Sequence, residues 1–597
     1  MTDVHRIRVF EYVPSPIVSC SLSDDTLLVG RESGYVEIWD VQNYSHCMCS
    51  FQATTPRDIR VVLWTEFKEQ KAFAICLFSG EVVIYNYPSL QIVGQSPSFG
   101  GAIWGAAVNS DKSLLAIACD DGVVRVFNTK DNLYLIQTSD ALVSKCLSVC
   151  FSSDGSLYAG DSTGKIEKID LETRVFVQTL NVASRDTTSS EVSVWALCAL
   201  PNGQIASGDS NGNVIIWNTA TATVETRFAS HQADVLTLAS NGRFLYASGI
   251  DPTVVTFEHD DGQWVQRNQQ RFHTHDVTCI VANEKHVISA GMDACICSKD
   301  LIHPFQVQMP IAVATRGEDI IAVGGEGNRL SIWRLNGEEA FLEVRLQTSN
   351  PVDAVAISSD GKNIAYSSTN TRFLEYDGTN WTLNKEKKHP KASAIINREN
   401  EFIMATISGD ILSSEGSFTH VDFPVFKLAV CEKYIVAGGL KRLVAFEKDL
   451  NGKSSELPYF GSPFSAIRFK PKTNLLFVST SSTKIFAYDV GEEKMVPSAN
   501  VNIGKFGEIV APTSISFDPD DTNRVLVVSS QVTLVANSMK EKGKFRLPYE
   551  DFLFGDFVKG KKLVVYEKPW SFMMHSLPMP FRVKRFQGSE ETKRPRY

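Results

Sequence analysis

Short runs of apolar residues alternate with glycine-rich and polar turns along the whole chain, and the runs end alike about every forty residues. The pattern is clearest at residues 34–40 (GYVEIWD) and 212–218 (GNVIIWN), and residues 122–127 (GVVRVF) repeat it with Phe in the Trp position. Runs rich in β-branched and aromatic residues, bounded by such turns, predict β-strands. We therefore expect an all-β protein.

Each repeat is expected to place the outer end of a blade strand at an aromatic or apolar anchor. The first series of anchors is Trp39, Tyr85, Phe127, Ile169, Trp217, Phe257 and Cys297, and the second is Trp333, Tyr376, Leu412, Phe446, Tyr488, Val535 and Tyr566. A second apolar strand opens each repeat, as at residues 103–108 and 194–198. A period of about 40–45 residues with glycine turns is typical of a WD40-type β-propeller.

The two series of anchors predict two tandem seven-bladed WD40-type β-propellers, because one propeller holds typically 4–8 blades. We place the first at residues 1–303 and the second at 304–577, with a basic tail without predicted structure at 578–597. Pro304 lies at the join, where it would interrupt a strand. Residues 4–12 alternate well enough to supply a closing strand, and either ring could receive it.

Composition narrows the class of protein. The chain has 597 residues and a net charge of −9, and 43% of its residues are hydrophobic. No apolar run approaches the ~20 residues of a membrane span, and the N-terminus has no apolar signal core. The 12 cysteines include no C-x-x-C pair. We expect no membrane association, no disulfide framework, no metal site and no cofactor.

Two stretches fit the G-x-S-x-G pattern of a hydrolase nucleophile elbow, at residues 160–164 and 208–212. An elbow requires a strand, a sharp turn and then a helix. Here a further strand follows each stretch, so both are predicted to be hairpin turns. The glycine-rich residues 324–328 also precede a strand, which favours a turn over a phosphate-binding loop.

Histidine and aspartate recur in phase with the repeat. His273 stands four residues before Val277, as His231 stands four before Val235, and Asp293 and Asp251 fall in the following turns. In a WD-type blade such residues form a buried hydrogen-bonded network with a Ser or Thr, and buried polar groups must be paired. The predicted network residues are His231, Asp251, His273, Ser289 and Asp293. The alternative for residues 273–276 is a metal cluster, which the repeat makes unnecessary.

Basic clusters offer a second kind of candidate site. Contact with RNA or a partner protein and plain solvated surface both remain open for them, and nuclear import is a further alternative for the tail. Given the net negative charge, we expect any RNA contact to be local, through such patches, or to occur inside a larger assembly. The candidate residues are Arg6, Arg8, Lys441, Arg442, Lys559, Lys561, Lys562, Arg582, Lys584 and Arg585.

Several stretches resemble the cirhin family of WD-repeat proteins. They are the opening residues 4–15, residues 99–104 (FGGAIW), residues 194–234, residues 273–293 and the ending 563–569. The opening and closing stretches lie outside the general WD pattern. The resemblance covers the full length, is densest in the first ring, and leaves a second half shorter than in the family.

The resemblance implies a non-catalytic scaffold of the nucleolus. Cirhin-like proteins belong to the early-binding subcomplex of the small-subunit processome, where they join other propeller and helical subunits on the 5′ external transcribed spacer of pre-ribosomal RNA. They support maturation of 18S RNA and are linked to RNA polymerase I transcription. No catalytic or cofactor-binding residues and no small-molecule substrate are implied.

Two other functions remain open. A cytoplasmic tandem-propeller scaffold of the cytoskeleton or of signalling would share the same architecture, because fold does not imply function. A propeller enzyme would need polar groups that converge in a central channel. The first strands are mainly small or apolar instead, as at residues 106–108 and 354–356.

Overall fold

The computed structural model confirms an all-β chain. Among the residues that it describes, the strands form fourteen sheets, and helix is almost absent: η1 (Pro201–Gly203) is a 3-10 turn of three residues. The described residues are 3–8, 14–42, 46–182, 192–298, 301–303, 309–336, 339–399, 401–447, 454–482, 484–497, 501–502, 511–529, 533–537, 545–546, 552–559 and 562–567.

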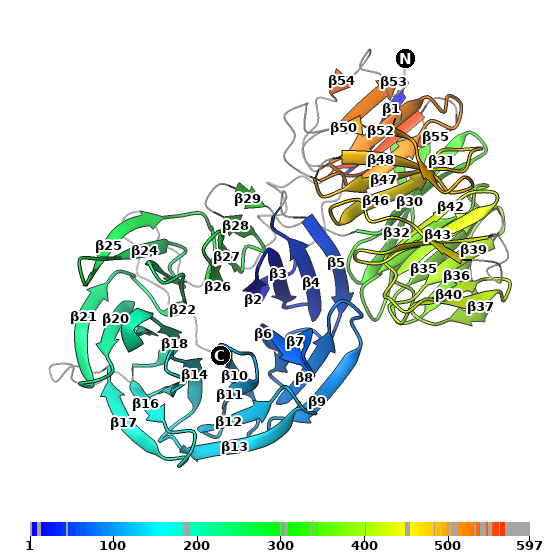
Figure 1. Ribbon diagram of the computed structural model, residues 1–597. Helices are drawn as coiled ribbons and strands as arrows, with labels where there is room; N and C mark the ends of the chain where they lie inside the picture. Colours follow the sequence, from blue (N-terminus) through cyan, green and yellow to red (C-terminus); the bar gives the residue numbers. More distant parts are fainter. Residues whose placement is uncertain are drawn as a thin grey trace. The chain divides into compact units, whose positions relative to one another are not determined.

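The chain divides into two compact units. The N-terminal unit contains Pro14–Trp39 and Ser50–Gln306, and the C-terminal unit contains Met1–Val13, Asp40–Cys49 and Val307–Ser576. Each unit is built mainly from antiparallel sheets of consecutive strands, and most of these sheets have four strands (Figure 1).

One sheet of the N-terminal unit shows why these sequences form such strands. It consists of β18 (Val194–Ala199), β19 (Ile205–Asp209), β20 (Asn213–Asn218) and β21 (Thr223–Ala229). Every residue of β19 is buried, whereas β21 is mostly exposed. Small residues with Ile205 therefore fill β19, apolar β-branched residues and Trp217 fill β20, and polar residues such as Thr223 mark the outer edge.

The first strands of neighbouring sheets contact one another in the N-terminal unit, and β26 contacts β2. Hydroxyl groups join them: Val62 N donates to Ser19 Oγ at 3.1 Å, and Thr278 Oγ1 donates to Ile17 O at 2.6 Å. These first strands are β2 (Ile17–Ser23), β6 (Ile59–Phe67), β10 (Ile103–Val108), β14 (Cys146–Phe151), β18, β22 (Val235–Ser240) and β26 (Val277–Ala282).

The C-terminal unit follows the same plan. Its successive first strands contact one another, and β55 contacts β30. They are β30 (Ile311–Arg316), β34 (Ala354–Ile357), β38 (Ala394–Arg398), β42 (Lys427–Val430), β46 (Phe464–Phe469), β51 (Ser514–Phe517) and β55 (Phe552–Val558).

Thirteen of the predicted anchors, from Trp39 to Val535, lie in the third strand of a sheet, one strand short of its outer edge in the four-stranded sheets. These strands are β4 (Tyr35–Asp40), β8 (Glu81–Asn86), β12 (Val123–Asn128), β16 (Lys165–Ile169), β20, β24 (Val254–Asp260), β28 (Ile296–Ser298), β32 (Arg329–Asn336), β36 (Thr371–Tyr376), β40 (Asp410–Ser413), β44 (Leu443–Glu447), β48 (Lys484–Asp489) and β53 (Thr533–Asn537).

The last anchor lies in a sheet that combines strands from both ends of the chain. Tyr566 is in β56 (Lys562–Glu567), the middle strand of the order β1-β56-β55. β1 (Asp3–Arg8) pairs with β56 in parallel, with Val4 opposite Leu563 and Tyr566 opposite Ile7. The N-terminal strand, for which the sequence left two rings open, thus adds to the last sheet of the C-terminal unit.

Candidate functional site

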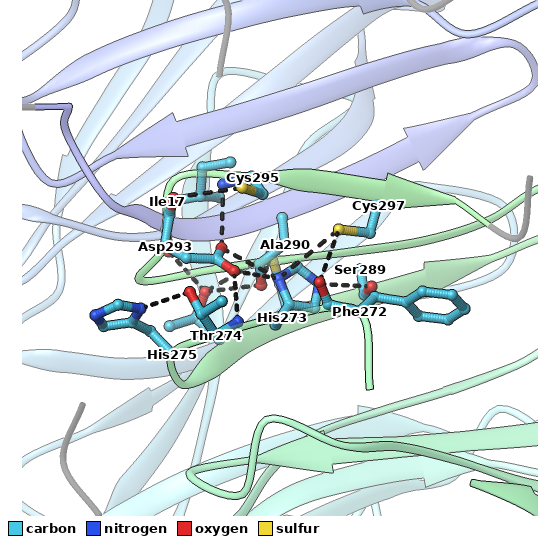
Figure 2. A network of polar contacts seen from close by, with 12 residues as sticks. Ile17, Phe272, His273, Thr274, His275, Ser289, Ala290, Asp293, Cys295 and Cys297 are labelled. Atoms are coloured by element: carbon cyan, nitrogen blue, oxygen red, sulfur yellow. Dashed lines mark hydrogen bonds and ion pairs between the residues drawn. The ribbon is translucent and has the colours of Figure 1, made fainter. Parts of the chain in front are cut away.

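The predicted histidine network forms at the last sheet of the N-terminal unit. His273 precedes β26, Ser289 lies in β27 (Val287–Gly291), and Asp293 lies in the turn to β28. The His273 Nδ1 atom is 3.0 Å from Asp293 Oδ2, and Nε2 is 2.8 Å from Ser289 Oγ (Figure 2). Because a carboxylate only accepts, Nδ1–H donates to Asp293, and in the neutral ring Nε2 accepts from the Ser289 hydroxyl.

Backbone amides complete the network. Thr274 N and Cys295 N each donate to the Asp293 carboxylate at 3.1 Å. His273 and Asp293 are each only 1% exposed, and burial raises the pKa of the neighbouring Cys297 thiol. A fully paired, dry network of this kind holds the segment before β26 against the β27–β28 turn. The network fixes the positions of these two segments relative to each other.

The equivalent residues one sheet earlier do not form the same network. Both ring nitrogens of His231 are buried without a hydrogen-bond partner among the described residues. Asp251 instead accepts from Thr253 Oγ1 at 2.7 Å and from Gln232 N at 3.4 Å. The physical reason lies in the repeat: Ala247 occupies the strand position that Ser289 has in the next sheet, because each stands two residues before the glycine that pairs with Val235 or Val277.

Burial without a hydrogen-bond partner lowers the pKa of the His231 imidazole. Desolvation disfavours its charged form, and although Asp251 acts in the opposite direction, the pKa of His231 is lowered from 6.5 to about 4. No group of three or more metal-binding side chains occurs within the part of the chain that the structure describes. His273 and His231 thus serve different local roles despite their common phase in the repeat.

Both G-x-S-x-G stretches are hairpin turns, as predicted. The first joins β15 (Leu157–Asp161) to β16, and the second joins β19 to β20. In the second turn the buried Asp209 carboxylate accepts from the amides of Asn211 and Asn213 at 2.8 and 2.9 Å. Asp161 accepts from Thr163 N and Lys165 N in the same way. The motif therefore places an aspartate to close a turn.

Two buried polar networks were missed from the sequence. Trp217 Nε1 donates to Ser207 Oγ at 2.8 Å, and Ser207 holds the same strand position as Ser289, so the repeat could have revealed it. In the first sheet Arg31 and Glu37 form a buried bidentate ion pair at 2.7 and 2.9 Å, and Trp39 Nε1 donates to Glu37 as well. A cross-strand Arg/Glu pair was visible in the sequence as charges inside two apolar strands.

The structure pairs Arg442 with acidic neighbours. Lys441 and Arg442 lie in the turn between β43 (Tyr434–Gly438) and β44, where a turn was predicted. Arg442 donates to Glu456 Oε1 at 2.7 Å and to Asp422 Oδ1 at 2.8 Å, and these hydrogen bonds raise its pKa. Lys441 beside it is exposed. Since two carboxylates already balance the Arg442 charge, Lys441 is the better candidate for an outside anion.

The remaining basic candidates that can be placed lie around the last sheet. Arg6 Nη1 is 3.5 Å from Glu567 Oε1, Lys559 is exposed at the end of β55, and Lys562 Nζ donates to Glu318 O at 3.2 Å. The Arg8 backbone pairs opposite Glu567. The Arg8 side chain and the residues Lys561, Arg582, Lys584 and Arg585 lie outside the described part of the chain.

Comparison with known protein families supports the predicted WD40-type repeat. The chain matches the family model "WD domain, G-beta repeat" over residues 93–128 and 182–218, which end at the third strands β12 and β20. Among the described residues, no helix has the length and apolar character needed to cross a membrane.

Several related proteins share one name. The chain is similar to U3 small nucleolar RNA-associated protein 4 of Schizosaccharomyces pombe, with 28% identity over 417 residues, 63% of this chain and 58% of that protein. It is also similar to the U3 small nucleolar RNA-associated protein 4 homologs of Mus musculus and Homo sapiens. Their identities are 24% over 682 residues and 25% over 685, covering 98% of this chain and 99% of each relative. The chain thus carries WD40 repeats. Its homologues are U3 small nucleolar RNA-associated protein 4, which is also called cirhin.

Proposed function

We propose that the chain forms two tandem seven-bladed WD40-type propellers. The first takes residues up to 303, and the second takes 304–577 together with the N-terminal strand. The contact of β26 with β2 and that of β55 with β30 support two closed rings. The parallel pairing of β1 with β56 supports the N-terminal strand as an element of the second ring. Residues 578–597 are proposed to be a basic tail.

We further propose that the protein is a non-catalytic scaffold in the nucleolus that associates with the U3 small nucleolar RNA particle and supports pre-ribosomal RNA processing for the small subunit. The observation that carries this proposal is the similarity over 98% of the chain to two proteins named for association with that RNA.

The finer parts of the proposal rest on the cirhin-like stretches. The partners would be propeller and helical subunits of the early-binding subcomplex, and the RNA target would be the 5′ external transcribed spacer, reached directly or through those partners. A link to RNA polymerase I transcription belongs to the same proposal. The buried His273–Asp293 network suits a scaffold, because paired groups inside a blade fix the surface that the loops present.

The test is purification of the tagged full-length chain under mild salt, with sequencing of the RNA and identification of the proteins. Enrichment of U3 RNA and 5′ spacer RNA over a small nucleolar RNA that guides nucleotide modification is the expected result. Depletion should also raise the ratio of unprocessed precursor to 18S RNA. Recovery of cytoskeletal or signalling proteins without U3 RNA, in a protein excluded from nucleoli, would instead support the cytoplasmic scaffold.

A further inference from the structure

Aromatic and basic side chains gather around Trp104 in the N-terminal unit. Trp104 is the second residue of β10, and its ring makes an edge contact with Phe78, with the centroids 5.4 Å apart. The guanidinium carbon of Arg60, from β6, lies 5.3 Å from the Trp104 centroid, and Lys145 Nζ lies 5.6 Å from it. We call Arg60, Phe78, Trp104 and Lys145, together with Phe99 from the segment before β10, the Trp104 cluster.

The strand order brings these residues to one edge of their sheets. In an antiparallel sheet of consecutive strands, the start of the first strand and the turn between the second and third strands lie at the same end. Arg60 and Trp104 are at the starts of β6 and β10, and Lys145 directly precedes β14. Phe78 follows β7 (Gln70–Leu77) in the turn to β8, and Phe99 lies in the segment before β10.

Arg60 lacks a negative partner. Its Nε donates to the Trp104 carbonyl at 3.1 Å, and no carboxylate among the described residues lies within ion-pair distance of it. Burial lowers the pKa of Arg60, because desolvation disfavours the charged form. A partly buried guanidinium with free donors and no carboxylate is suited to an anion from outside.

Two of the three aromatic members are presented to solvent. Phe78 is 47% exposed and Phe99 is 61% exposed. Phe99 has a φ of 59°, a left-handed conformation that is unfavourable for a bulky residue. Arg125, bound to Asp121 at 2.6 Å, holds that backbone by donating to the Phe99 carbonyl at 3.1 Å. A strained residue that is held in place with its ring exposed indicates use of the ring.

Exposed rings beside cations match the alternation of bases and phosphates along a single nucleic acid strand. Bases stack on aromatic side chains that lie open to solvent, and guanidinium and ammonium groups bind the phosphates. We propose that the Trp104 cluster binds a short single-stranded segment of RNA, with a phosphate at Arg60 and bases against Phe78 and Phe99. This inference rests on the proposed association with an RNA particle and assigns its contact surface.

Asp120 reduces the positive charge of the Trp104 cluster. Its Oδ1 accepts from Trp104 Nε1 at 3.0 Å and lies 2.7 Å from Lys145 Nζ. The Lys145 and Asp120 side chains are 53% and 40% exposed, so this bridge is weak and Lys145 can turn to a phosphate. The Asp120 charge repels the same phosphate. Asp120→Asn, which keeps an acceptor for Trp104, should therefore tighten RNA binding about two- to five-fold.

The experiment measures the fluorescence anisotropy of fluorescein-labelled oligoadenylate and oligouridylate dodecamers with the full chain at several salt concentrations. Arg60→Met should weaken binding at least about ten-fold and reduce the salt slope by about 0.7, the value for one phosphate on a single strand. Phe78→Leu and Phe99→Leu should each weaken it about five-fold through lost stacking. Arg60→Met should leave the unfolding temperature unchanged or raised, because an uncompensated charge is removed.

Two substitutions serve as matched controls. Arg243 also lies over a phenylalanine ring, 5.1 Å from Phe244, but it is paired with Glu258 and lies in the turn at the opposite end of its sheet. Phe418, in β41 (Phe418–His420) of the C-terminal unit, is 52% exposed. Arg243→Met and Phe418→Leu should change RNA affinity less than about two-fold.

Equal losses in Arg60→Met and Arg243→Met would overturn the proposal, since they would indicate a non-specific effect of charge. So would displacement of the RNA by an oligoglutamate peptide of the same length at equal concentration, which would identify an acidic protein segment as the occupant. Copurification of U3 RNA with Arg60→Met separates the two proposals. U3 recovery without cluster-dependent RNA binding refutes this surface alone, and loss of U3 from the wild-type chain refutes the proposed function.

Discussion

His273 Nδ1 lies 3.0 Å from Asp293 Oδ2, and neither side chain is more than 1% exposed. Twenty residues separate the pair along the chain, so its formation joins the segment before β26 to the turn that ends β27. A buried polar contact thereby ties these two segments together at one end of the sheet. Both nitrogens of the buried His273 imidazole are hydrogen-bonded, as buried polar groups usually are.

Replacing Asp293 by Asn should destabilise the N-terminal unit. The amide removes the negative charge and leaves His273 or a backbone amide without its acceptor, which costs about 1–3 kcal/mol. Thermal and urea unfolding of the full chain would measure the loss. Asp251→Asn is the control, because Asp251 makes no hydrogen bond to His231 in the equivalent turn. Equal losses in both variants would contradict a special role for the His273 contact.

Ala247→Ser should supply the hydroxyl that the neighbouring sheet lacks. Ala247 is fully buried at the position of Ser289, and both ring nitrogens of His231 are unpartnered among the described residues. One new hydrogen bond to a buried ring should add about 1 kcal/mol of stability, and Ser289→Ala should remove a similar amount. Urea midpoints of the two variants give the comparison. Destabilisation by Ala247→Ser would show that the hydroxyl does not reach His231.

Stability should depend on pH through His231. Its pKa is about 4 in the folded chain against 6.5 for an unperturbed histidine, so the unfolded chain binds the proton first. The contribution of His231 is fully present above pH 6.5 and is lost as the pH falls to 4, by about 3 kcal/mol. The difference in unfolding free energy between wild type and His231→Phe should therefore shrink or reverse between about pH 7 and pH 4.5. Parallel pH profiles would refute the shift.

The sequence predicted the fold class and the phase of the strands, because both follow from a local pattern. Turn glycines and apolar alternation repeat along the chain, and so Trp39 and Trp217 each fall in a third strand. The partner of the N-terminal strand could not be predicted, because its pairing with β56 depends on residues more than 550 positions apart. Alternation gives a strand's faces but not its neighbour.

The interactions of the candidate residues likewise depend on residues that the local pattern does not identify. His273 and His231 have the same spacing to the following strand, and only the third member, Ser289 or Ala247, decides whether a network forms. Arg442 stood out as a basic residue, yet its charge is balanced by Glu456 and Asp422, which lie 14 and 20 residues away. Arg60 was not selected from the sequence, because a single arginine in a strand is ordinary. Only the structure shows that no described carboxylate lies within ion-pair distance of it.

The turn glycines allow a sharper test, because two share one backbone conformation but not one environment. Gly155 has a φ of 84° and Gly212 a φ of 83°. A Cβ atom on Gly155 would meet nothing within 4 Å, whereas one on Gly212 would lie 2.3 Å from the His231 carbonyl oxygen. Gly155→Ala should cost only the left-handed conformation, about 1–2 kcal/mol. Gly212→Ala must also displace the backbone before β22, so we expect a loss larger by several kcal/mol, as for other severe steric changes. Urea unfolding of both variants decides: equal losses would mean that the segment at His231 yields without cost, and that the turn is not packed against it in solution.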